Sequence, residues 1–194
     1  MTPTYQELLT GGTEWYFTDL PIRYSLAFHG HRTGEEHPNA EPHPGIWCYY
    51  LHIDEEMFPH RWNDFKPTGE GWDSYSTHSI THDMFDTEIT YHRSKLYKSR
   101  KDGKIYDSRK VGCDYNHLWH HERGYPDTFQ SVKADARRTV KAFLEANPDY
   151  RVCCAYSGVW GEKADFVETN KGGWVHKSKV ANAPPQWFKP EVAQ

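Results

Sequence analysis

Residues 127–148, DTFQSVKADARRTVKAFLEANP, carry the hydrophobic pattern of an amphipathic helix. Asp127 is expected to cap the N-terminus, and Asn147 followed by Pro148 is expected to end the helix. Apolar residues recur at helical spacing and form a single stripe, which consists of Phe129, Val132, Ala136, Val140, Phe143 and Leu144. The stretch therefore predicts a helix over about residues 127–146 with one side available for burial.

The segment before this helix has the pattern of a β-hairpin. Apolar and polar residues alternate in parts of Thr87–Tyr115, and Lys101–Gly103 supplies a tight-turn signal between the two halves. Two earlier runs, 22–29 and 47–53, alternate in the same way and are expected to pair as an antiparallel ribbon. A last strand is expected over residues 152–157.

Strands on both sides of one long helix predict an α+β fold, in which an antiparallel sheet packs one face against the helix. The length of 194 residues fits a single domain, 1–194. The Pro-, Glu- and His-rich stretch 32–45 is expected to be a surface loop, and the polar segment from about 181 to 194 a poorly anchored tail.

The composition favours a soluble protein of the cytoplasmic type. No apolar run approaches the ~20 residues of a membrane helix, and the first 20 residues lack the pattern of a secretory signal. We therefore expect no membrane contact, and we expect the four cysteines to be free thiols in a reducing compartment.

Charge is distributed unevenly along the chain. Residues 1–92 hold 4 basic and 15 acidic side chains, whereas residues 93–194 hold 19 basic and 12 acidic ones. The two halves should attract each other within one domain, and they could also present one acidic and one basic face to partners. Interleaving of the charges on a mixed surface is the alternative.

The expected hairpin is the most basic segment, and its lysines and arginines are interleaved with Tyr97 and Tyr106. A basic ribbon of this kind can bind an anionic partner or track the phosphates of a nucleic acid. Lysines on a strand edge also prevent edge-to-edge aggregation, which is the competing interpretation. The candidate contact residues here are Arg93, Lys98, Arg100, Lys101 and Lys104.

Thirteen histidines raise the question of a metal site, because neutral imidazole is a common ligand for zinc. The densest group is His117, His120, His121 and Glu122; the best strand pair is His29 and His31, which lie two residues apart and share a face. Both groups are candidates for a divalent metal and hence for a metal-dependent hydrolase or nuclease. The alternative is that these histidines are solvated or cap backbone groups.

Other catalytic signatures are absent from the sequence. There is no Gly-x-Ser-x-Gly elbow, no phosphate-binding loop and no Cys-x-x-Cys pair. These absences favour a protein without enzymatic activity and without a cofactor, and they leave the metal-dependent enzyme as the alternative.

The run Val111–Trp119, followed by Gly124–Thr128 and the helix, resembles small accessory proteins of bacteriophages and mobile elements, as does Trp47–Tyr50. The resemblance covers about a third of the chain and implies no particular activity for any residue. It implies a protein that binds a host or phage macromolecule in the host cytoplasm, with interference in host defence as one form of that role. We expect the aromatic connection after the hairpin to add contacts through Asp114, Tyr115, His117 and Trp119.

Overall fold

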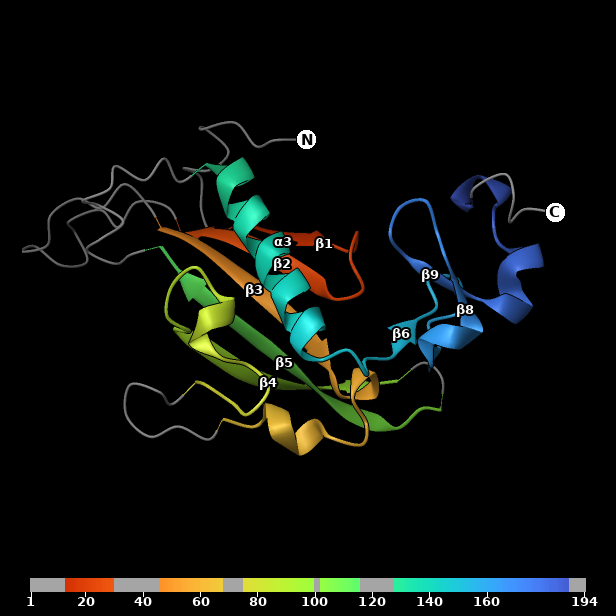
Figure 1. The fold of residues 1–194 in the computed structure, drawn as a ribbon, viewed down its shortest axis with the longest axis horizontal. Helices are drawn as coiled ribbons and strands as arrows, with labels where there is room; N and C mark the ends of the chain where they lie inside the picture. The colour runs from red at the N-terminus through yellow and green to blue at the C-terminus, as the bar shows by residue number, and fades with distance from the viewer. Residues whose placement is uncertain (1–12, 30–45, 68–74, 100–101, 116–127, 189–194) are drawn as a thin grey trace, which may run out of the picture.

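The computed structural model describes residues 13–29, 46–67, 75–99, 102–115 and 128–188. Five antiparallel strands form the main sheet, in the order β1-β2-β3-β5-β4 (Figure 1). Their bounds are β1 Thr13–Phe17, β2 Arg23–His29, β3 Ile46–Asp54, β4 Tyr91–Lys98 and β5 Ile105–Asp114. Among the described residues there is one α-helix, α3 (Phe129–Ala146), which crosses in front of β2 and β3 in this view. The expected α+β class, with a mostly antiparallel sheet and one helix, is confirmed.

The helix begins two residues later than the sequence predicted. Thr128 is the N-cap: its hydroxyl accepts from the Ser131 amide at 3.1 Å, and the Ser131 hydroxyl accepts from the Thr128 amide at 3.0 Å. This reciprocal capping satisfies two backbone donors that would otherwise lack a partner. Asp127, the predicted cap, lies outside the described residues. The predicted end is confirmed, because Asn147 is the C-cap.

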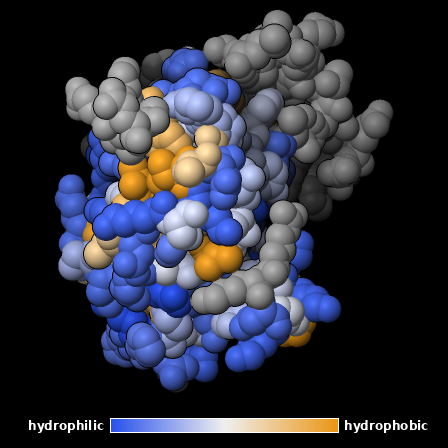
Figure 2. Space-filling view, turned by 90° about the vertical axis from the view of Figure 1, so that its right-hand side faces the viewer, coloured by the Kyte–Doolittle hydropathy of each residue, from blue (hydrophilic) through white to orange (hydrophobic). Residues whose placement is uncertain are grey.

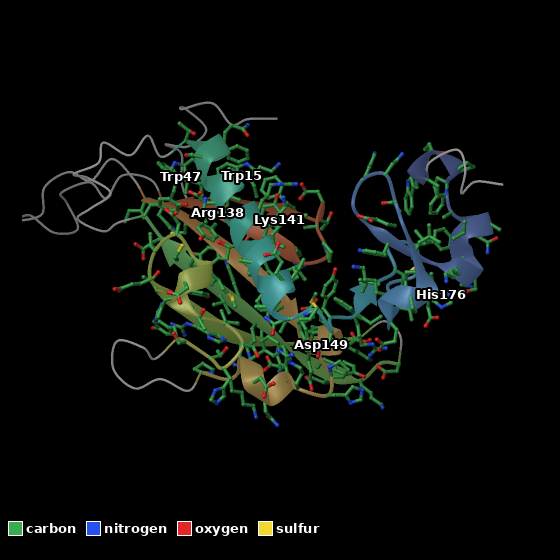
Figure 3. All side chains as sticks on the ribbon, viewed as in Figure 1. Trp15, Trp47, Arg138, Lys141, Asp149 and His176 are labelled. Atoms are coloured by element: carbon green, nitrogen blue, oxygen red, sulfur yellow. The ribbon has the colours of Figure 1, made fainter. Side chains whose placement is uncertain are left out.

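The apolar stripe of α3 shares one buried cluster with alternate side chains of the sheet, among them Tyr24, Leu26, Tyr49 and Leu51. The Tyr49 hydroxyl lies 2.9 Å from Thr139 Oγ1 within this core. Aromatic rings surround Phe129 at the first turn of the helix, where Figure 3 labels Trp15 and Trp47. Burial of this many large rings is the main stabilising contribution to the sheet and helix.

The predicted hairpin and ribbon are both present. Strands β4 and β5 pair antiparallel, and Gly103 turns the chain with a φ of 72°, a left-handed conformation that favours glycine. Strands β2 and β3 pair with Tyr24 opposite Leu51. Strand β1, which the sequence analysis did not predict, adds to the edge of β2 with Tyr16 opposite Ser25.

The expected final strand over residues 152–157 is wrong. Only β6, Val152–Cys153, is extended, and it pairs with β7, Trp160–Gly161, in a separate two-stranded sheet. The chain reverses between them, where the Gly158 amide donates to the Cys154 carbonyl at 2.7 Å and Gly158 has a φ of 70°. Gly158 adopts a left-handed backbone conformation, which lets the chain turn here instead of continuing as a strand.

Residues 152–188 form a small C-terminal unit. It contains a second two-stranded sheet, β8 (Phe166–Glu168) with β9 (Trp174–His176), and its own buried cluster. Ala183 and Phe188 belong to that cluster, so the expectation of a poorly anchored tail is wrong for residues 181–188. Short 3-10 turns complete the chain at 55–57, 62–65, 82–84, 163–165, 177–182 and 185–187. From the side of this unit the surface is mostly hydrophilic, with small hydrophobic patches (Figure 2).

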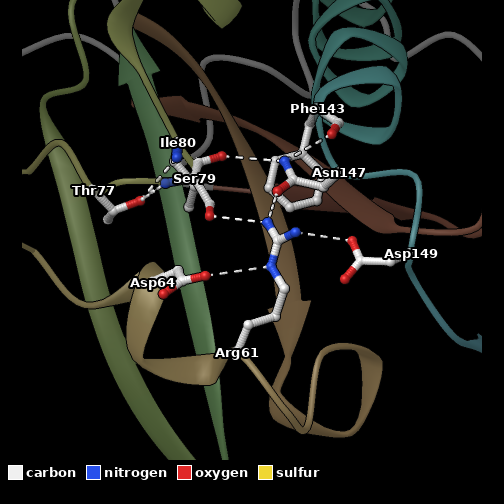
Figure 4. A network of polar contacts seen from close by, with 8 residues as sticks. All are labelled: Arg61, Asp64, Thr77, Ser79, Ile80, Phe143, Asn147 and Asp149. Atoms are coloured by element: carbon white, nitrogen blue, oxygen red, sulfur yellow. Dashed lines mark hydrogen bonds and ion pairs between the residues drawn. The ribbon is translucent and has the colours of Figure 1, made fainter.

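Arg61 joins the end of α3 to two loops (Figure 4). Its guanidinium donates to Asp149 Oδ1 at 2.9 Å and to Ser79 Oγ at 3.0 Å, and it also contacts the Asn147 side-chain oxygen. The same group lies 5.6 Å from the ring centroid of Phe58. The guanidinium of this partly buried arginine therefore holds together polar groups from the helix end and from both loops.

Replacing Arg61 by alanine should lower the free energy of unfolding by about 2 kcal/mol, because partly buried acceptors lose charge-assisted hydrogen bonds. Urea denaturation measures the change. The Arg61→Lys variant keeps the positive charge but not the planar guanidinium group, so its free energy of unfolding should fall by about half as much. Equal stability of the alanine variant and the wild type would show that the network contributes nothing.

Candidate functional site

The sheet has a second face, which is turned away from α3. Side chains alternate along each strand, so Tyr24 and Leu26 of β2 join the main core while Arg23 and Ser25 point to the other side. Among the described residues, the buried apolar cluster on that side is small and consists of Ala27, Cys48 and Tyr50, next to the buried polar residues Ser25 and His52. We call this second side of the sheet the polar face.

Strand register aligns the polar face into two rows that run across the strands. Directly paired positions place Arg23, His52, Lys110 and Arg93 side by side on β2, β3, β5 and β4. We call these four residues the basic row. With strands about 4.8 Å apart, the row is about 14 Å long.

A row of tyrosines lies beside the basic row. The paired positions two residues along each strand hold Tyr16, Ser25, Tyr50, Gly112 and Tyr91. Gly112 is required in the middle, because a Cβ atom there would clash with the Tyr49 carbonyl oxygen and the Tyr50 ring. The ring of Tyr50 lies against this glycine, and Lys110 Nζ lies 4.0 Å from the ring centroid.

Glu14 organises one end of the two rows. Its carboxylate accepts from the Ser25 hydroxyl at 2.5 Å, from the Tyr16 hydroxyl at 2.9 Å and from Lys110 Nζ at 2.9 Å. Burial alone would raise the pKa of Glu14, but these three hydrogen bonds lower it overall. The carboxylate is therefore ionised at neutral pH and neutralises Lys110.

His52 is held neutral within the basic row. Burial lowers its pKa to about 4, and the positive charges of Arg23 and Lys110 act in the same direction. Its Nε2 lies 2.7 Å from Ser25 Oγ. The imidazole thus acts as an uncharged hydrogen-bonding group at neutral pH.

Serine, histidine and glutamate occur together here, but not in the order of a hydrolytic triad. In such a triad the histidine lies between the serine and the acid, whereas here Ser25 lies between Glu14 and His52. Ser25 has no exposed surface, so its hydroxyl is not accessible to a substrate. The cluster holds side chains of the polar face in place.

In the part of the chain that the structure describes, three cations of the polar face form no close ion pair with a carboxylate. Asp54 lies on the same face; burial raises its pKa, and the positive charge of Arg23 acts against this rise. Within the described residues, no ion pair within 4.0 Å joins Arg23, Arg93 or Lys95 to an acidic side chain, unlike Lys110. All four line a groove with a volume of about 640 Å³. Arg23 lies 5.9 Å from the Tyr16 ring centroid and Arg93 5.9 Å from that of Tyr91, so tyrosine rings support both guanidinium groups.

Comparison with protein-family models, curated proteins and solved structures finds no match. The groove and its charges are therefore the basis for assigning a function. No helix among the described residues is long and apolar enough to cross a membrane.

The basic side chains that were predicted on the hairpin, where the structure describes them, lie on both faces of the sheet. Arg93 belongs to the polar face, whereas Lys98, five residues along β4, points to the opposite side of the sheet. Lys104 is exposed beside the turn and lies 3.8 Å from Asp102. Arg100 and Lys101 lie outside the described residues. The two-stranded hairpin is present, and its described basic side chains are divided between the two faces of the sheet.

The predicted contacts after the hairpin are only partly described. Asp114 ends β5 on the polar face, opposite Cys48. Tyr115 is 2% exposed and donates to Asp135 Oδ2 at 2.6 Å, so its predicted role as a surface contact is wrong. His117 and Trp119 lie outside the described residues.

The predicted metal ligands also fall mostly outside the described ranges. They are His31, His117, His120, His121 and Glu122. His29 is exposed at the end of β2, opposite Ile46. Among the described residues, no group of three or more histidine, cysteine or acidic side chains is placed to hold a metal ion. The metal-dependent enzyme stays a prediction of the sequence.

Sequence analysis did not identify the site residues that lie on the first three strands. Glu14 and Tyr16 lie on the unpredicted β1, and Arg23, Ser25 and His52 were not recognised as site residues. The alternation in 22–29 and 47–53 already placed the last three on the non-core side of their strands. The register that aligns His52 with Lys110 could not be obtained from the pattern alone.

Proposed function

We propose that this chain is a binding protein that acts by occupying an anionic macromolecular partner, and that the groove on the polar face is its binding surface. One observation carries the proposal: Arg23, Arg93 and Lys95 line the groove and form no ion pair within 4.0 Å among the described residues, whereas Lys110 is paired with Glu14. A cluster of cations without close ion pairs, on a protein of net charge −4, favours association with negative charge at that place.

The rigidity of the groove supports the same proposal. Its cations lie on paired strands rather than on loops, and tyrosine rings lie beside the guanidinium groups of Arg23 and Arg93. Less conformational freedom is then lost when a partner binds. A host or phage macromolecule is the partner that the resemblance to phage accessory proteins suggests, and interference with host defence would be one result of occupying it.

Reversing two charges of the groove should weaken capture of the partner at least tenfold. The test compares the wild type with the double variant Arg93→Glu and Lys95→Glu in quantitative capture from host cells, with and without nuclease treatment. The physical reason is that binding of an anionic partner depends on complementary charge, and glutamates at these two positions would repel it. The measured quantity is the amount of each macromolecule that co-purifies at equal bait.

The matched control is Lys177→Glu with Lys179→Glu, which changes the same charge at two exposed positions two residues apart in the C-terminal unit. Its capture should equal that of the wild type. If the two double variants capture equally, or if nothing captured depends on Arg93 and Lys95, the proposal is wrong.

A further inference from the structure

Resting on the proposed function, we propose that the groove binds a single strand of nucleic acid, with its phosphates along the basic row and its bases against the tyrosine row. The two rows run parallel across the strands, two residues apart along each strand that they share. A nucleic acid strand has the matching division, with anionic groups along one side and planar rings along the other.

The basic row provides charges at a separation that suits several phosphates. Arg23 and Arg93 stand at its two ends, about 14 Å apart by strand spacing, and Lys95 lies two residues further along β4 from Arg93. None of the three forms an ion pair within 4.0 Å with a carboxylate in the described part of the chain. Three such cations can neutralise about three phosphates, which is the sequence-independent source of affinity for a single strand.

The tyrosine row provides the surface for bases. Tyr16 is 55% exposed, and Tyr91 is half-buried at the far edge of the sheet. Exposed rings on a sheet face stack on bases without selecting one base over another. An acidic protein segment would use the cations but would have no need of a parallel row of rings.

The dimensions of the groove favour one strand over two. At about 640 Å³ it has the size of a pocket that encloses a drug-sized molecule. A duplex would keep its bases paired and stacked on each other, away from the tyrosines. We therefore expect single strands to bind more tightly than duplexes of the same length.

The test measures fluorescence anisotropy of a labelled oligothymidylate of about 12 nucleotides titrated with the full chain, between about 50 and 200 mM salt. Wild-type affinity should fall with salt at a logarithmic slope of about −2, or roughly −0.7 for each of three phosphates. The Arg93→Gln variant should bind several-fold more weakly and lose about 0.7 of that slope. Tyr16→Ala should weaken binding several-fold without changing the slope.

Lys141→Gln is the control, because Lys141 is exposed on α3, on the other side of the sheet (Figure 3). It removes the same charge and should leave both affinity and slope unchanged. A duplex of the same sequence and thymidine monophosphate are the competing ligands. Equal affinity for the duplex, binding of the mononucleotide alone, or an unchanged slope in Arg93→Gln would overturn the inference.

Failure of this inference can be distinguished from failure of the proposed function. If the oligonucleotide does not bind but a nuclease-resistant protein is captured through Arg93 and Lys95, the inference fails and the proposed function holds with a protein partner. If neither the oligonucleotide nor any partner depends on these residues, both fail.

Discussion

Replacing Phe143 by alanine should lower the free energy of unfolding by about 4 kcal/mol, the largest single effect expected in this fold. Phe143 has no exposed surface, and its ring packs against those of Phe58 and Phe65 at centroid distances of 5.8 Å and 5.9 Å. Alanine would leave a cavity that the neighbouring rings fill only partly. Transfer of the lost ring surface and the residual cavity both contribute to the loss.

Urea denaturation monitored by circular dichroism measures this effect. Lys141→Ala, two residues away on the exposed side of α3, is the control, and it should change the free energy of unfolding by less than about 0.5 kcal/mol. A loss below about 1 kcal/mol for Phe143→Ala would mean that α3 is not anchored through this ring.

The stability of the protein should fall as the pH is lowered from about 6.5 to about 4, and His52 should account for about 3 kcal/mol of that loss. Burial lowers the pKa of His52 to about 4 in the folded protein, from an ordinary value of 6.5. Between these values the unfolded chain binds a proton that the folded chain does not. Acid therefore favours unfolding in this pH window. Below about pH 4, His52 has made its full contribution to the loss of stability.

The His52→Gln variant isolates this contribution, because an amide can still hydrogen-bond to Ser25 but does not titrate. Unfolding free energies at about pH 7.5 and pH 4.5 should differ less in the variant than in the wild type. Titrating groups far from His52 are common to both proteins and cancel in the comparison. The same pH dependence in both would show that His52 is not held neutral by its surroundings.

The pattern of the sequence predicted the elements with strong local signals. The helix was evident because six apolar residues recur at helical spacing, and the hairpin because Gly103 follows Asp102 between alternating strands. The first strand was missed because Thr13–Phe17 carries three consecutive aromatic residues and no alternation. The C-terminal unit was missed because its strands have two or three residues, too few to show a period.

The candidate site depended on information that no local pattern contains. Lysines and arginines close together in the hairpin sequence were expected to act together, yet Arg93 and Lys98 lie on opposite faces of β4. Arg23 and Arg93, seventy positions apart in the chain, lie in one row because β3 and β5 pair between their strands. Such a row follows from strand order and register, which tertiary packing determines.

The central claim is that partners bind to the polar face, and mapping by nuclear magnetic resonance tests it most directly. Amide signals of the isotope-labelled protein would be compared before and after addition of the oligothymidylate or the captured partner. We expect the largest changes at Arg23, His52, Lys110 and Arg93, across four neighbouring strands, and none at Lys141 on α3. Changes confined to α3 or to the C-terminal unit, with the basic row unaffected, would contradict the claim.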